Sequence, residues 1–121
     1  MGFSRRGVLR FAYPPEKNSL FAGSDWGGQK VLWVSDPKYG GPILIRGRQV
    51  DGTNGIRFGL AGPRLLEELA FPGHSADNWS GGWRNFPSYT RLRGPGCYAY
   101  QVDGAGFSDT IVFRASIWAF W

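Results

Sequence analysis

The 121-residue chain has little of what metal centres and disulfide scaffolds need, with one cysteine, Cys97, and one histidine, His74. A lone cysteine excludes an internal disulfide, so packing alone must hold the fold together. One imidazole and one thiol are too few for a zinc cluster, and no carboxylate spacing resembles a calcium loop. We therefore expect no metal centre and no cofactor.

Long apolar runs are also missing. No stretch approaches the roughly 20 apolar residues that span a bilayer. Arg5 and Arg6 superficially match a twin-arginine export signal, but the apolar segment that should come next is replaced by Phe11-Ala12-Tyr13-Pro14-Pro15. The chain is predicted to have neither a signal peptide nor a transmembrane segment.

Runs of like charge are absent as well. The formal charge of +5 comes from 14 lysines and arginines against 9 acidic residues, and 11 of the cations are arginines scattered along the chain. Scattered cations are typical of a mildly basic, solvated surface. The sequence carries no specific nucleic-acid signal.

What the chain has in quantity are turn residues and aromatics. Its 19 glycines and 8 prolines are spread along the sequence, and 17% of its residues are aromatic. Frequent turns between short elements, with side chains that favour strands, predict an all-β domain.

The clearest element is a β-hairpin within residues 94–115. Tyr98, Tyr100 and Val102 alternate on one face of its first strand, and Ile111, Phe113 and Ala115 alternate on one face of the second. The linker Asp103-Gly104-Ala105-Gly106 supplies residues that tolerate positive φ. A lone hairpin is marginal in water, so a second layer must cover this apolar face.

Further strands are expected at residues 29–35, 43–50, 56–60 and 89–93. In the first, Val31 and Trp33 face one way and Lys30, Leu32 and Val34 the other. Trp33, Tyr100 and Phe113 are predicted to share one core. Residues 62–70 have the most helical composition in the chain, and a helical turn and a short strand are both compatible with it, the strand being preferred. Residues 72–88 are expected to form a loop.

That expected loop is unusual because it holds large aromatic residues. Together with neighbouring arginines, they form a candidate ligand surface in which rings stack on a ligand and guanidinium groups add hydrogen bonds and cation–π contacts. The alternative is that Trp83 and Phe86 plug the open end of the sandwich. The candidate ligand-binding residues are Trp79, Trp83, Arg84, Tyr89, Arg91 and Arg93.

Catalysis finds little support in the sequence. Cys97 with His74 as its base is the one nucleophile arrangement the chain allows, but free cysteine more often packs in a core. No Gly-x-Ser-x-Gly turn is present, and the adjacent Glu67 and Glu68 point away from each other. No catalytic residue is assigned.

The C-terminal segment after Ala115 is apolar and uncharged. A soluble monomer seldom exposes such an apolar cluster to solvent. We expect it to form a self-complementary homodimer contact through Ile117, Trp118, Phe120 and Trp121.

Two stretches carry a resemblance to a known family, residues 30–52 with Trp33 and residues 83–115 with Pro87-Ser88 and Pro95-Gly96-Cys97-Tyr98. They resemble an uncharacterised bacterial family of small β-sandwich domains. The resemblance implies an immunoglobulin-like sandwich of about seven short strands, often exported, with no activity to transfer. The family's secretory segment is missing here.

The expected organisation is an N-terminal extension (residues 1–13), a sandwich (14–115) and an apolar tail (116–121). The predicted function is a non-enzymatic binding or structural module. The alternative is a small hydrolase or transferase that uses Cys97 with His74.

Overall fold

The computed structural model describes residues 7–15, 20–59 and 63–117, in which it shows nine strands and no helix. The strands are β1 (Val8–Phe11), β2 (Gly27–Ser35), β3 (Ile43–Gln49), β4 (Arg57–Gly59), β5 (Leu69–Phe71), β6 (Asn78–Ser80), β7 (Trp83–Leu92), β8 (Gly96–Gly104) and β9 (Phe107–Ile117).

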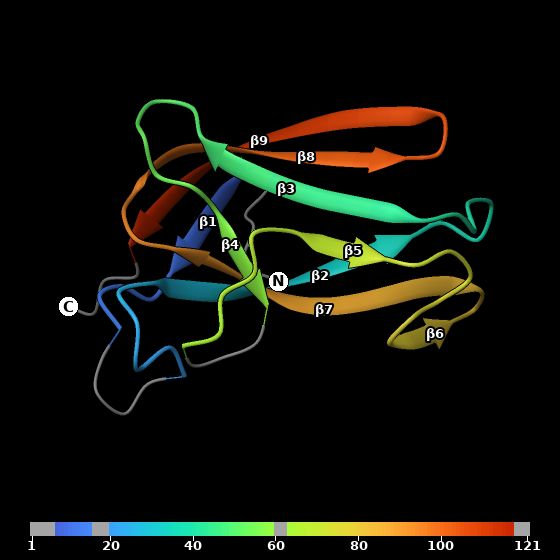
Figure 1. The fold of residues 1–121 in the computed structure, drawn as a ribbon, viewed down its shortest axis with the longest axis horizontal. Helices are drawn as coiled ribbons and strands as arrows, with labels where there is room; N and C mark the ends of the chain where they lie inside the picture. The colour runs from blue at the N-terminus through green and yellow to red at the C-terminus, as the bar shows by residue number, and fades with distance from the viewer. Residues whose placement is uncertain (1–6, 16–19, 60–62, 118–121) are drawn as a thin grey trace.

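The strands form two sheets that pack face to face (Figure 1). The larger sheet has the order β1-β9-β8-β3-β5, and the smaller has β2-β7-β4, with β6 also paired to β7. The predicted all-β sandwich is confirmed, with nine strands in place of about seven.

The core lies between the inward faces of the two sheets and is centred on Tyr100. The Trp33 ring meets the Tyr100 ring edge-on at 4.9 Å between centroids, and Phe113 stacks on Tyr100 at 4.6 Å. These contacts join the two layers and confirm the predicted grouping of Trp33, Tyr100 and Phe113. The Tyr100 hydroxyl lies 2.7 Å from the Thr90 hydroxyl, and burial raises the pKa of Tyr100 well above its ordinary value. The phenol therefore stays protonated in the core.

The hairpin expected at residues 94–115 is present as β8 and β9. Gly104 faces Phe107 across a two-residue turn, and Gly106 has a φ of +87°. Tyr98, Tyr100, Phe113 and Ala115 are buried, as their alternation predicts, but Ile111 on the same face is 43% exposed. The reason is that β9 has a neighbour on its far side only from Arg114 onward, where β1 pairs with it.

Strand β1 lies in the segment expected to precede the sandwich. It pairs in parallel with β9, with Val8 facing Arg114, and both Leu9 and Phe11 are fully buried in the core. Just beyond it, Ala12 and Gly28 exchange two backbone hydrogen bonds of 3.1 and 3.2 Å, which link β1 to the smaller sheet. Val8–Phe11 is thus part of the fold. The sequence around β1 does not indicate this pairing, because its partner β9 lies about a hundred residues further along the chain.

The segment from residue 69 to residue 92 contains three strands, β5, β6 and β7. Residues 69–71 are the short strand β5, as preferred, but the expected loop at 72–88 is wrong, because β6 and most of β7 lie in it. Gly81 and Gly82, both at positive φ, make a two-residue turn between the two strands.

The backbone carbonyl of Asn85 in β7 accepts a hydrogen bond from the Asp77 N–H. Because the direction of the backbone groups alternates along a strand, the odd-numbered residues of β7 direct theirs toward β6 and β4. Pro87, with no N–H, lies in the gap between those two strands.

Candidate functional site

Arg84, predicted to contact a ligand, is buried at the end of the sandwich where β7 begins, with 1% of its surface exposed. Its Nε donates to Ser75 O at 2.7 Å, and its Nη atoms donate to Gly41 O at 2.8 Å and Pro72 O at 2.9 Å. The guanidinium also lies over the Phe86 ring at 5.3 Å. These bonds hold two loops together and leave Arg84 unavailable to a ligand.

Arg91 is also buried, on the outer side of the smaller sheet beneath the loop that precedes β2. It donates to Gly27 O at 3.0 Å and Trp26 O at 2.8 Å, and it lies over the Phe21 ring at 4.8 Å. Burial lowers its pKa from the usual arginine value, although the group remains a cation. A side chain at position 28 would lie 3.0 Å from Arg91 Cδ, so Gly28 makes room for this packing. Arg91 is therefore a structural residue.

The remaining four predicted residues do not gather at one site. Tyr89 packs edge-on against Phe21 at 5.3 Å, and Arg93 stacks on Trp26 at 4.9 Å. Trp79 and Trp83 lie on the β6–β7 hairpin and are 56% and 42% exposed. Since Trp83 and Arg93 are ten residues apart along nearly straight strand, roughly 30 Å separates them. The structure divides the six residues among two buried loop anchors, two packing groups and an exposed tryptophan pair.

Cys97 and His74 lie at opposite ends of the sandwich. His74 N–H donates to Gly40 O, close to the end of β8 at Gly104, whereas Cys97 is near the start of that strand (Figure 1). The Cys97 side chain is half-buried on the outer face of the larger sheet and not in the core. The length of β8 that separates the two ends is about 20 Å. A nucleophile and its base must be within hydrogen-bond reach, so Cys97 and His74 are too far apart.

The predicted C-terminal contact falls mostly outside the described residues. Ile117, at the end of β9, pairs with Phe11 and is 39% exposed. Trp118, Phe120 and Trp121 lie beyond the described part of the chain.

The outer face of the larger sheet carries two arginines on one strand. Strand alternation turns Arg46 and Arg48 of β3 outward while Ile45 enters the core, and the outward neighbours of Arg46 across the sheet are Gln101 and Thr110. Gly47 between the two arginines is required, because a Cβ there would lie 2.6 Å from Ala99 O and 2.5 Å from the buried Ile56. Alternation along β3 places the two arginines on one face, and the pairing with β8 shows which residues lie beside them.

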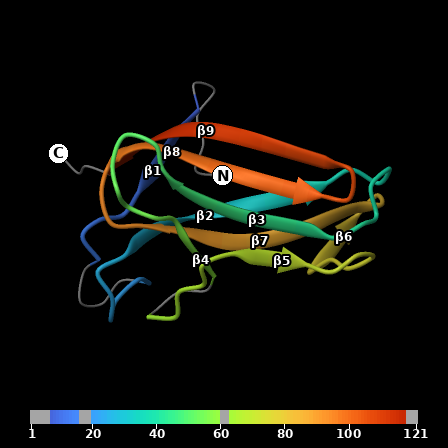
Figure 2. The same cartoon turned by 45° about the horizontal axis from the view of Figure 1, so that its top comes forward.

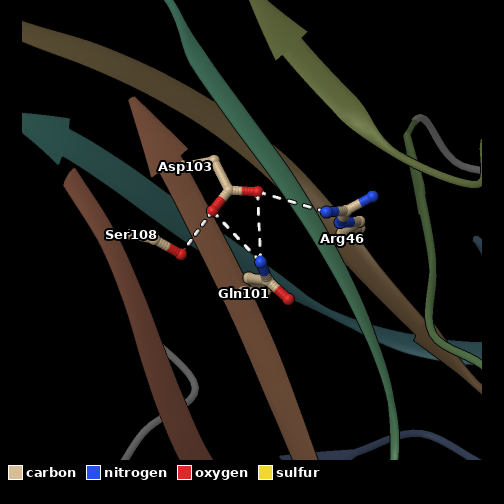
Figure 3. Close-up of polar contacts among 4 residues, drawn as sticks. All are labelled: Arg46, Gln101, Asp103 and Ser108. Atoms are coloured by element: carbon tan, nitrogen blue, oxygen red, sulfur yellow. Dashed lines mark hydrogen bonds and ion pairs between the residues drawn. The ribbon is translucent and has the colours of Figure 1, made fainter. Parts of the chain in front are cut away.

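Asp103 anchors one side of this surface (Figure 3). It accepts hydrogen bonds from Ser108 Oγ at 2.6 Å and Gln101 Nε2 at 3.1 Å, and Arg46 Nη2 lies 3.4 Å from its carboxylate. The bonds from Ser108 and Gln101, with a smaller contribution from Arg46, lower the pKa of the carboxyl below its ordinary value. Asp103 thus remains ionised and neutralises Arg46 in part.

Arg48 has no such counterpart. It is exposed, and its lateral neighbour across the sheet is Ala99, followed by Val112. Among the described residues, the one ion pair is that of Arg46 with Asp103. A shallow hollow of about 400 Å³ opens beside the two arginines, hereafter the arginine hollow. The residues that line it are Arg46, Gly47, Arg48, Val50, Ala99, Tyr100, Gln101 and Thr110.

Residues 7–15, 20–59 and 63–117 contain no group of three or more His, Cys, Asp or Glu side chains that could hold a metal ion. The same residues include no helix long and apolar enough to cross a bilayer.

Comparison of the chain with protein-family models, curated proteins and solved structures finds no match. The resemblance to a bacterial sandwich family stays a prediction, and the function must be argued from the geometry.

Proposed function

We propose that the protein is a non-enzymatic binding module that takes an anionic ligand in the arginine hollow. The observation that carries this proposal is Arg48, an exposed guanidinium on a rigid strand with no acidic partner among the described residues. A guanidinium presents a planar fork of donors that matches carboxylate, sulfate and phosphate groups. Ala99 and Val50 provide an apolar floor beside the guanidinium.

The ligand we favour is an acidic polysaccharide. A single exposed ion pair is worth only about 0.2–1 kcal/mol, so useful affinity needs repeated anionic groups along one chain. Arg46 and Arg48 are two residues apart on β3, and Arg114 lies on the same face two strands away. The one aromatic residue among the described residues that line the hollow is Tyr100, whose side chain is fully buried with its ring in the core, whereas single-stranded nucleic acid binds by stacking its bases on accessible rings.

The supporting chemistry does not extend to the other candidates. Trp79 and Trp83 are exposed, but the neighbouring Arg84 cannot contact a ligand beside them, because it is buried and donates its hydrogen bonds to backbone carbonyls. Cys97 and His74 are too far apart to act together. The immunoglobulin-like identity of the sandwich remains part of this proposal.

The test is a titration with dextran sulfate, with unsulfated dextran as the uncharged probe. Arg48→Gln should weaken dextran sulfate binding about fivefold or more, since it removes a charge-assisted contact. Arg64→Gln is the matched control, because Arg64 is exposed in a loop and its loss changes the net charge equally. We expect a change below about twofold for the control.

Two results would count against the proposal. Equal weakening by Arg48→Gln and Arg64→Gln would show that only diffuse charge is involved. Tighter binding of single-stranded DNA than of dextran sulfate at equal charge concentration would refute the choice of polysaccharide.

A further inference from the structure

Within the part of the chain that the structure describes, strand β9 has an open edge over its first half. From Phe107 to Ala115 it pairs with β8, but on the other side β1 reaches only Arg114 to Ile117 (Figures 1 and 2). From Phe107 to Val112, none of the described residues pairs with β9 on that side. A sheet edge of this kind presents unpaired N–H and C=O groups that can extend the sheet with another strand.

The direction of these backbone groups follows from one hydrogen bond. Arg114 N–H donates to Gly7 O at 2.9 Å, so Arg114 directs its backbone groups away from β8. Along a strand this direction alternates from residue to residue. Ser108, Thr110 and Val112 therefore direct their N–H and C=O groups to the side of β9 that faces away from β8, where Gly7 lies beside the Val112 carbonyl at the end of the open edge.

The edge also lacks the usual protection against pairing. Natural edges are guarded by lysine, proline or bulges, whereas Phe107 to Val112 reads Phe-Ser-Asp-Thr-Ile-Val, with Asp109 as its one charge. Ile111 and Val112 are 43% and 62% exposed. Thr, Ile and Val side chains favour strand pairing.

We propose that this edge pairs with the same edge of a second copy of the chain, antiparallel, about a two-fold axis at Thr110. In this register Thr110 faces the partner's Thr110, and Ser108 faces the partner's Val112. Each facing residue is one that directs its backbone groups outward, so each facing pair exchanges two hydrogen bonds. A threonine pair facing itself is also a favourable cross-strand combination.

Asp109 selects this register against its neighbours. With the axis at Thr110, Asp109 faces the partner's Ile111. An axis shifted to Asp109, or an in-register parallel arrangement, would place the two Asp109 carboxylates side by side, and like charges directly opposed are destabilising. Because the contact joins the same edge of both copies, it is closed at two chains by its symmetry.

The pairing has a consequence for the arginine hollow. A two-fold axis perpendicular to the joined sheet leaves the outer faces of both copies on the same side. Thr110 lines the hollow, so the two hollows would adjoin across the axis. The dimer does not depend on the proposed ligand, because it rests on the backbone edge alone.

Cysteine cross-linking tests the register in a Cys97→Ser background, which removes the native thiol. Thr110→Cys should form a disulfide-linked dimer under mild oxidation, since facing residues lie about 5.5 Å apart between Cα atoms, within disulfide range. Ser108→Cys is the matched control. It lies on the same face of the same strand, but its copy in the partner would be about 14 Å away. Combining Ser108→Cys with Val112→Cys should restore cross-linking.

Sedimentation velocity tests the dimer without cross-links. The full chain should show a dimer fraction that rises with concentration up to several hundred micromolar. Thr110→Pro should remain monomeric, because it removes an outward N–H while leaving the bonds to β8 intact. Circular dichroism must show unchanged strand content for this variant. A full chain that stays monomeric, or equal cross-linking of Thr110→Cys and Ser108→Cys, would overturn the proposal.

Discussion

At the scale of single residues, the two buried arginines show how this fold uses cations to anchor its loops. Arg84 and Arg91 direct their guanidinium groups at backbone carbonyls of loops and at aromatic rings. Buried polar groups have to be hydrogen-bonded, and the fork of an arginine satisfies several carbonyls at once. Arginines that look like ligand contacts in the sequence thus become anchors for the loops around them.

We expect Arg84→Met to destabilise the protein by about 3–5 kcal/mol, because it leaves the carbonyls of Ser75, Gly41 and Pro72 without a donor. Arg84→Lys should recover little of this, since an ammonium cannot reproduce the planar fork. Urea unfolding measures the effect, with the exposed Arg114→Met as the control, expected within about 0.5 kcal/mol of wild type. A small loss for Arg84→Met would mean that the loops do not depend on this anchor.

At the scale of elements, the two-residue hairpin turns decide where strands begin and end. Gly106 in the β8–β9 turn has a φ of +87°, and a Cβ there would meet no atom within 4 Å. Any cost of substitution at this position therefore comes from the backbone conformation alone and not from a clash.

Gly106→Ala should lower the free energy of unfolding by about 1–2 kcal/mol, and Gly106→Asn by less, because asparagine tolerates left-handed φ better than alanine. Thermal unfolding of both variants checks this order. If alanine and asparagine cost the same, the φ of the turn does not carry the effect.

At the scale of the whole molecule, Trp33 joins the two layers. Its ring packs on Tyr100 of the opposite sheet, while its Nε1 is buried and has no hydrogen-bond partner among the described residues. The contribution of Trp33 to stability should therefore come from its ring and not from its N–H.

Trp33→Ala should cost about 3–5 kcal/mol, in the range of large-to-small core changes. Trp33→Phe should cost clearly less, since it keeps an aromatic ring and removes an unpaired donor. Chemical denaturation of the three proteins measures the differences. An unfolding midpoint unchanged by Trp33→Ala would contradict the role of this residue in the core.

The sequence by itself determined the strand-rich class, the terminal hairpin and the faces of β2, because side-chain alternation and turn chemistry are local properties. The strands within residues 72–88 could not be predicted from the sequence, since the Gly, Ser, Asn and Pro content of this stretch is typical of loops. Only the pairing with β2 makes β7 a strand. Only the tertiary structure decided that Arg84 and Arg91 are buried, that Arg48 faces Ala99 without an acid, and that β1 leaves half of β9 uncovered. Each of these depends on which distant segments lie side by side, and no local pattern records that.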